Sequence, residues 1–182
     1  MEFLTLEEVI QRYPIEEVKT QYLSLLSVLS ETLMISNDEF KHQLNKITRT
    51  GLVWVCIKND KCIKNDKCIK NDQKNDKCIK NDQKNDQKND QKNDQKKFQI
   101  IGTGTLLFEP KLSHGCKYVG HIEDIVVHPD FRGLNIACTI LDKLKEFARP
   151  HCYKVILHCK EELKEFYEKN GFVSSNLLIM KI

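Results

Sequence analysis

The sequence predicts one α/β (α+β) domain, built on a mixed, mostly antiparallel central sheet that is flanked by helices. Runs rich in Val, Ile, Phe and Trp alternate with segments of helical periodicity. After residue 97 the expected order is strand, strand, helix, strand, helix, strand, which includes one βαβ crossover. The chain has 182 residues, and without its repeat at 58–96 it has the size of one ordinary domain.

The segment before the repeat is expected to be mainly helical. Residues 3–6 have the apolar character of a short edge strand. Ser36 and Glu39 have the spacing of a capping box, which predicts a helix that begins there and continues to about Gly51. A helix is also expected over 16–29, with one apolar face formed by Val18, Tyr22, Leu25, Leu26 and Leu29.

Residues 58–96 form a low-complexity insert that contains eight Lys-Asn-Asp triplets. The insert lacks aromatic residues and is expected to be disordered, because it cannot bury enough apolar surface to offset the entropy of ordering. The flanking runs at 52–57 and 98–108 are expected to be strands. We interpret the insert as an expanded hairpin loop outside the functional site, since each doubling of a loop costs only about 0.6 kcal/mol.

The part after the insert is expected to complete the sheet. Strands are predicted at 100–108, 118–127, 153–159 and 172–181, and helices at 134–148 and 161–169. Asn170-Gly171 suits a left-handed helix end, and Arg149-Pro150 stops the longer helix. That longer helix is expected to bury Ile136, Ile140, Leu141, Leu144, Phe147 and Ala148.

Composition argues against several classes of protein. The net charge of +3 is too small to indicate binding to nucleic acid or to a membrane surface. The N-terminus is acidic, and no run approaches the ~18 apolar residues of a membrane span, so a cytoplasmic protein is expected. The eight cysteines include no Cys-x-x-Cys pair, which favours buried free thiols and no metal site.

The stretch at 120–137 carries the strongest chemical signal. Glu123 and Asp124 stand side by side on an apolar strand, and a turn with Arg132 and Gly133 then leads into a helix. Free N–H groups at such a helix start can hold a phosphate, although alone the pattern also fits an ordinary β–α turn. Because successive strand side chains point to opposite faces, at most one of the two carboxylates is expected to face any given pocket.

Three blocks in this region resemble the GNAT superfamily of N-acetyltransferases. Arg-x-x-Asn-x-Ala at 132–137 stands where that superfamily carries Arg/Gln-x-x-Gly-x-Gly/Ala, its acyl-CoA pyrophosphate loop. More narrowly, Gly-His-Ile-Glu-Asp-Ile-Val-Val, Cys-Tyr-Lys-Val-Ile-Leu and Glu-Phe-Tyr-Glu-Lys-Asn-Gly-Phe resemble the eukaryotic glucosamine-6-phosphate N-acetyltransferases. The resemblance covers about residues 111–173.

The resemblance implies transfer of acetyl from acetyl-CoA to the 2-amino group of glucosamine 6-phosphate, without a covalent enzyme intermediate. It also implies a homodimer whose product feeds UDP-N-acetylglucosamine biosynthesis. For the acetyl-CoA it implies a pantetheine contact at Ile125, Val126 and Val127, with the Val126 N–H as the oxyanion donor. The implied pyrophosphate loop consists of Arg132, Gly133, Leu134, Asn135, Ile136, Ala137 and Cys138.

The remaining site residues are also implied by the resemblance. Tyr167 would protonate or stabilise the departing thiolate, and Glu123 or Asp124 would bind the ammonium group and help to remove its proton. The other implied substrate contacts are Ser30, Lys111, His114, Tyr153, Lys154 and Lys181.

Three positions depart from the family pattern. Asn135 replaces the central glycine of the loop, and Asn is the non-glycine residue that best tolerates a left-handed conformation. His158 stands where relatives carry an aspartate and is a candidate proton relay, and Leu163 replaces a common asparagine. Two alternatives stay open: an acetyltransferase for another amine or peptide, and a degenerate, non-catalytic CoA-binding protein.

Overall fold

The computed structural model describes residues 1–59 and 97–175, so most of the insert and Lys181 lie outside the described residues. The strands are β1 (Glu2–Thr5), β2 (Gly51–Asn59), β3 (Phe98–Pro110), β4 (Tyr118–Val127) and β5 (Cys152–Leu157). The α-helices are α1 (Leu6–Arg12), α2 (Ile15–Leu26), α3 (Asn37–Arg49), α4 (Ile136–Ala148) and α5 (Lys164–Lys169). Short 3-10 turns are η2 (His114–Cys116), η3 (Pro129–Phe131) and η4 (Glu161–Leu163).

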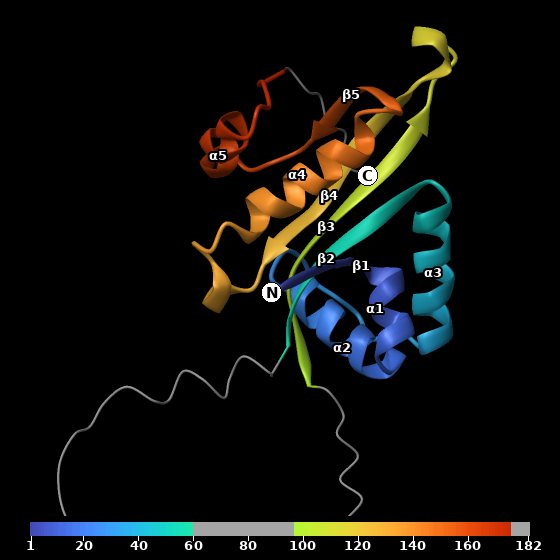
Figure 1. Cartoon of the computed structure of the whole chain (residues 1–182), viewed down its shortest axis with the longest axis vertical. Helices are drawn as coiled ribbons and strands as arrows, with labels where there is room; N and C mark the ends of the chain where they lie inside the picture. Colours follow the sequence, from blue (N-terminus) through green and yellow to red (C-terminus); the bar gives the residue numbers. More distant parts are fainter. Residues whose placement is uncertain (60–96, 176–182) are drawn as a thin grey trace, which may run out of the picture.

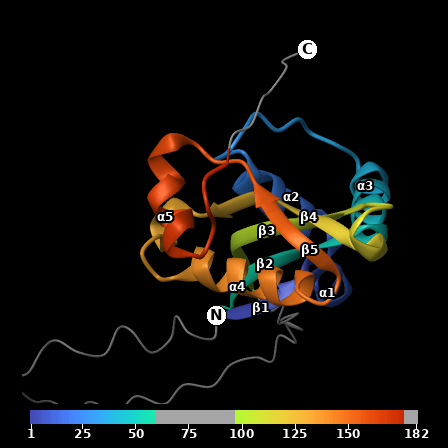
Figure 2. The same cartoon turned by 90° about the horizontal axis from the view of Figure 1, so that it is seen from above.

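The five strands form one mixed sheet in the order β1-β2-β3-β4-β5. The first three pairs are antiparallel, and β4 pairs with β5 in parallel through the α4 crossover. Helices α1 to α3 contribute to one apolar core and α4 to a second, so the two cores lie on opposite faces of the sheet (Figures 1 and 2). The predicted mixed sheet and its crossover are confirmed.

Local capping decides how the N-terminal helices begin. The expected edge strand is present but ends at Thr5, because the Thr5 side chain and Glu8 form a capping box that starts the unpredicted helix α1. That helix has seven residues, too few for its periodicity to stand out in the sequence. The capping box predicted at Ser36 is confirmed, with the Glu39 N–H donating to Ser36 Oγ at 3.1 Å.

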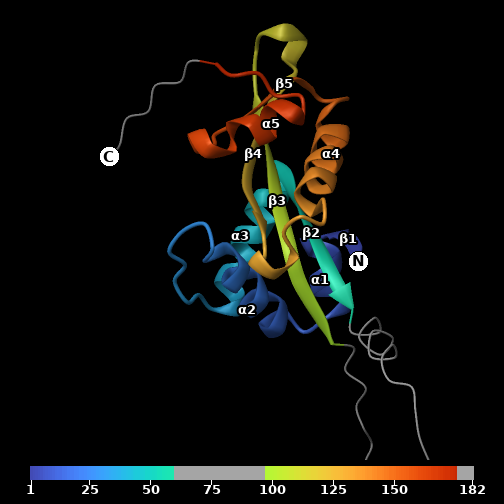
Figure 3. The ribbon, with the colours of Figure 1, turned by 90° about the vertical axis from the view of Figure 1, so that its left-hand side faces the viewer.

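The two strands that flank the insert are paired up to their ends. Asn59 lies opposite Phe98, so Lys58 and Asn59 belong to β2. The prediction that the insert begins at residue 58 is therefore wrong by two residues. Pairing with β3 extends β2 two residues beyond Ile57, the last apolar residue of the strand. The end of β2 and the start of β3 lie side by side (Figure 3).

Strand β4 contains a bulge at its two carboxylates. Thr105 pairs with Glu123 and Thr103 pairs with Val126, so Asp124 and Ile125 together stand opposite Gly104. Asp124 has a left-handed φ of 55°. A Cβ on Gly104 would lie 2.5 Å from Ile125 Cδ1 and 2.7 Å from Ile140 Cγ2, so glycine makes room for the bulged strand beneath α4.

We expect the Gly104→Val substitution to lower the free energy of unfolding by about 1–3 kcal/mol, because it overpacks the core beneath α4. Thermal unfolding of the purified full chain would measure the loss. A variant as stable as the parent would contradict the requirement for glycine at this position.

Other predictions about the C-terminal half need correction. Phe147 is 42% exposed, because it lies at the edge of α4 and stacks on Phe108 rather than entering the core. Residues 172–175 form no strand, so the predicted strand at 172–181 does not begin there, and its remainder lies outside the described residues. Gly171 has a φ of 88°, as expected for the left-handed end of α5.

The cysteines differ from the expected buried thiols. Those at 62, 68 and 78 lie outside the described residues, and the five described cysteines are all free. Only Cys56 among those five is buried, whereas Cys116 and Cys159 are exposed. Sequence spacing does not determine burial, which depends on the packing of each element. In the two described ranges no helix is long and apolar enough to cross a membrane.

Candidate active site

The candidate site lies where β4 and β5 diverge. Their pairing ends at Ile122 and Leu157, and β4 continues to Val127 paired only with β3. The divergence opens a cavity of about 730 Å³, called here the first cavity. It is walled by β4, the turn before α4, the end of β5 and helix α5.

Glu123 and Asp124 both belong to the lining of the first cavity. The bulge interrupts the alternation of side chains between the two faces of the sheet at these residues. The expectation that at most one of the two carboxylates faces a given pocket stays a prediction. Asp124 is exposed as a whole residue, but partial burial of its carboxyl raises the pKa above its ordinary value, which makes it a stronger base than a fully solvated aspartate.

The start of α4 provides a place for an anion at the other end of the cavity. Gly133 and Asn135 both adopt left-handed conformations, with φ values of 78° and 57°. Asn135 thus takes the conformation that its sequence position predicts. It is the N-cap residue but makes no side-chain capping bond, so the first N–H groups of α4 remain free for a ligand. Arg132 is exposed beside them.

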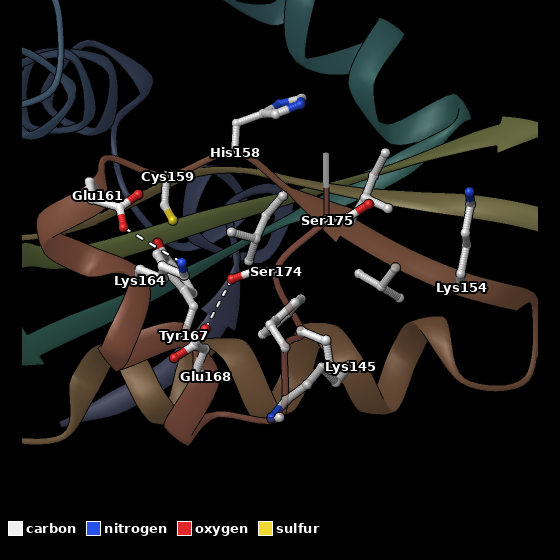
Figure 4. A pocket seen from close by; sticks show the side chains of 16 residues that line it. Lys145, Lys154, His158, Cys159, Glu161, Lys164, Tyr167, Glu168, Ser174 and Ser175 are labelled. Atoms are coloured by element: carbon white, nitrogen blue, oxygen red, sulfur yellow. Dashed lines mark hydrogen bonds and ion pairs between the residues drawn. The ribbon is translucent and has the colours of Figure 1, made fainter. Parts of the chain in front are cut away.

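The wall opposite β4 is formed by the end of β5 and by α5. Tyr167 is 8% exposed, and its pKa is raised first by burial and then by the nearby thiol of Cys159. His158 and Cys159 line the same cavity. Figure 4 shows the Cys159 sulfur directed toward Tyr167, whereas His158 extends away from it.

A second cavity, of about 850 Å³, lies on the other side of this wall. It shares His158, Cys159 and Tyr167 with the first cavity and also receives Lys154 from β5 (Figure 4). Tyr167 therefore stands between the two cavities.

Several predicted substrate contacts lie outside the first cavity. His114 stacks on Tyr153 with ring centroids 3.8 Å apart, and Lys154 Nζ lies 5.7 Å from the Tyr153 ring centroid. Lys111 forms an ion pair with Glu109. These side chains gather beside the β3–β4 connection and the start of β5, away from the carboxylates.

Most of the residues predicted to bind acetyl-CoA line the first cavity. Leu134 is the one member of the predicted pyrophosphate loop that does not line the first cavity. Ser30 does not line it either, but the preceding Val28 and Leu29 do. Leu163, which departs from the family pattern, also lines the cavity. The cavity-lining residues that the sequence did not indicate are Ile122, Val28, Leu29, Phe131, Leu157, Cys159, Lys160, Glu162 and Phe166. Most lie in loops or at element ends, where no periodic pattern marks them.

The first cavity fits an acyl-CoA thioester on structural grounds. An uncapped helix start suits a pyrophosphate, and the edge of β4 that lacks a partner strand suits an extended amide chain such as pantetheine. A Cβ on Gly133 would meet nothing within 4 Å, so this face of the turn is open to a ligand.

A mixed sheet whose strands diverge beside an uncapped helix start is the arrangement expected of the acetyltransferase class. The family model of the acetyltransferase (GNAT) family matches residues 72–172, and the chain belongs to this family.

Known relatives point in the same direction. The chain is similar to glucosamine 6-phosphate N-acetyltransferase of Trypanosoma brucei brucei, with 44% identity over 75 residues, which cover 41% of this chain and 51% of that protein. It is also 44% identical to glucosamine 6-phosphate N-acetyltransferase 1 of Dictyostelium discoideum over 75 residues, which cover 41% and 48% of the two chains. The chain thus spans about half the length of the curated relatives it matches.

Solved structures share the fold. The crystal structure of glucosamine-6-phosphate N-acetyltransferase from Arabidopsis thaliana aligns with a TM-score of 0.67 at 21% identity, covering 100% of this chain and 97% of that one. An acetyltransferase of Trypanosoma brucei aligns with a TM-score of 0.67 at 24% identity, covering 100% and 98%. At this identity the likeness establishes the fold alone.

Proposed function

We propose that the protein acetylates the 2-amino group of glucosamine 6-phosphate, giving N-acetylglucosamine 6-phosphate and CoA for UDP-N-acetylglucosamine biosynthesis. The observation that carries the proposal is that Glu123 and Asp124 both line the first cavity. An ammonium group binds to carboxylates and must lose its proton before it attacks a thioester. The names of the curated relatives support glucosamine 6-phosphate as the amine.

The residues have distinct roles in this proposal. Asp124, with its raised pKa, removes the proton of the amine, and Glu123 helps to hold the ammonium group. The Val126 N–H donates to the thioester oxygen as negative charge develops there. The Tyr167 hydroxyl, like that of any tyrosine, is protonated at neutral pH, burial raises its pKa further, and it gives its proton to the leaving thiolate. His158, at the cavity rim, is a further candidate for relaying the proton to solvent.

The phosphate of the sugar requires counter-charge. We assign this role to Lys154 and Lys111, with Tyr153 and His114 as further contacts. Lys154 lies near the Tyr153 ring on which His114 stacks, and Lys111, in the β3–β4 connection, is paired with Glu109. Ser30 and Lys181 complete the proposed set. The separation of this group from the carboxylates supports a homodimer, in which a second copy brings further groups to the site. The proposed place of this reaction is the cytoplasm. Sedimentation of the purified protein would show a monomer if the proposed homodimer does not form.

Thiol release separates this function from its alternatives. Purified full chain would receive acetyl-CoA with glucosamine 6-phosphate, glucosamine or a lysine peptide. The proposal requires the highest kcat/KM with the sugar phosphate. Preferred turnover of the peptide would indicate another amine substrate, and acetyl-CoA binding without thiol release would indicate a non-catalytic CoA-binding protein.

Removal of the insert is expected to leave activity nearly unchanged. Because Asn59 already pairs with Phe98, replacing residues 60–97 by Asn-Gly would connect the strands through a two-residue hairpin turn. We expect kcat/KM for acetyl-CoA to stay within about twofold, since loop length affects closure only weakly. A large fall in rate with unchanged thermal unfolding would show that the insert takes part in function.

A further inference from the structure

The strand ends that frame the insert are clamped by side chains from α2 and its preceding loop. Tyr13 stacks on Phe98 with ring centroids 3.8 Å apart, and its hydroxyl donates to Asn59 Oδ1 at 3.1 Å. The Gln21 side chain donates to the Phe98 carbonyl at 3.1 Å and accepts from the Ile100 N–H at 2.9 Å. These contacts tie β2 and β3 to the helical layer just where the insert begins.

Lys58 is the residue beside this clamp, and it reaches the wall of the first cavity. Its Nζ lies 5.2 Å from the centroid of the Phe131 ring. Phe131 lines the first cavity and packs edge-to-face on His128 with centroids 5.6 Å apart. Phe131 also directly precedes Arg132, the first residue of the proposed pyrophosphate loop. Lys58, at the end of β2, thus lies over the side chain that immediately precedes that loop.

We propose that Lys58 is a positioning residue for acetyl-CoA, which acts by holding Phe131 and thereby the turn that leads into α4. A cation over an aromatic ring fixes the orientation of the ring, because the ammonium is attracted to its negative face. The contacts of Tyr13 with Asn59 and Phe98 hold the strand ends next to Lys58 and so limit the movement of its backbone. The proposal depends on acetyl-CoA binding and is independent of which amine accepts the acetyl group.

The chain contains a matched control for this contact. Lys143 Nζ lies 4.7 Å from the Trp54 ring centroid and 5.8 Å from that of Phe3. None of these three residues lines either cavity. Removing the Lys143 charge therefore disrupts a cation–π contact of the same kind without touching the proposed cofactor loop.

The test is the affinity of the full chain for acetyl-CoA, measured by calorimetry without an amine acceptor. We expect Lys58→Met to weaken binding about three- to fivefold, the range of a partly exposed cation–π contact. Lys58→Arg should restore the affinity to within about twofold, since guanidinium also binds aromatic faces. Lys143→Met should leave it unchanged. Unchanged binding by Lys58→Met, or an equal loss in Lys143→Met, would overturn the proposal.

A double-mutant cycle identifies the route of the effect. If Lys58 acts through Phe131, the Lys58→Met substitution has no further effect in a Phe131→Leu background. A full loss in that background would show that the charge acts on the ligand directly and would reject the positioning role. In turnover, the proposal requires a raised KM for acetyl-CoA with kcat within about twofold of the parent value. Because binding is measured without acceptor, failure of the proposed sugar substrate would leave this result intact.

Discussion

The Tyr167→Phe variant is expected to lose about 10²- to 10³-fold in kcat, while KM for acetyl-CoA changes little. The phenol is the buried weak acid on the wall opposite Glu123 and Asp124, and burial raises its pKa above the ordinary tyrosine value. Removal of its hydroxyl leaves the departing thiolate without a proton donor. Steady-state thiol release with glucosamine 6-phosphate would measure the loss.

The structure makes this substitution conservative in every other respect. The Tyr167 ring packs edge-to-face on Phe166 and Phe172, with centroids 5.1 and 6.0 Å apart, and phenylalanine keeps both contacts. Tyr118→Phe serves as the control, because Tyr118 also packs on an aromatic neighbour but lines neither cavity. A Tyr167→Phe enzyme with normal kcat would remove Tyr167 from the chemical step.

The Asp124→Asn variant is expected to lose at least about 100-fold in kcat/KM yet to be as stable as the parent or more stable. Asparagine cannot accept the amine proton. It does tolerate the left-handed backbone of this position, where φ is 55°, so the bulge should persist. Glu123→Gln is the paired comparison, and we expect a smaller loss from it because Asp124 carries the raised pKa.

The stability part of this prediction follows from the direction of the pKa shift. Burial raises the pKa of Asp124, so above the ordinary aspartate pKa the folded state binds its proton more tightly than the unfolded state does. The Asp124 contribution to stability is therefore largest at low pH and is lost as pH rises through the folded pKa. Asparagine removes this cost at neutral pH. Chemical unfolding of both proteins at pH 4 and pH 8 would measure it, and a variant that loses stability at pH 8 would contradict the assignment.

Local sequence signals predicted the elements of this protein well. The capping box of Ser36 and Glu39, the extent of β4 and the left-handed Asn135 all match the sequence-based expectations. Each depends on residues only a few positions apart, because capping bonds and backbone preferences act within one or two turns. The helix α1 was missed although Thr5 and Glu8 have the same capping-box spacing, because its seven residues give too short a periodic pattern.

The site was only partly predictable. The first cavity depends on the divergence of β4 from β5, and loop residues such as Leu29 and Lys160 enter it without any periodic signal. The basic group around Tyr153 was predicted as part of the same site, but it lies beside a different region of β5. The number of residues between two positions in the sequence does not determine the distance between their side chains in the folded sheet.

The stretch that contains Glu123, Asp124 and the turn into α4 was predicted from the sequence alone as the chemical centre of the protein. What only the tertiary structure decided is that Glu123 and Asp124 line the same cavity as this turn and that Lys58 lies over the ring of Phe131, just before the turn. The bulge exists because Gly104, on a neighbouring strand, yields space to Ile125. Helix caps and turns are determined by residues close together in the sequence. Strand register and the contact between Lys58 and Phe131 instead arise from packing between segments that are distant in the sequence.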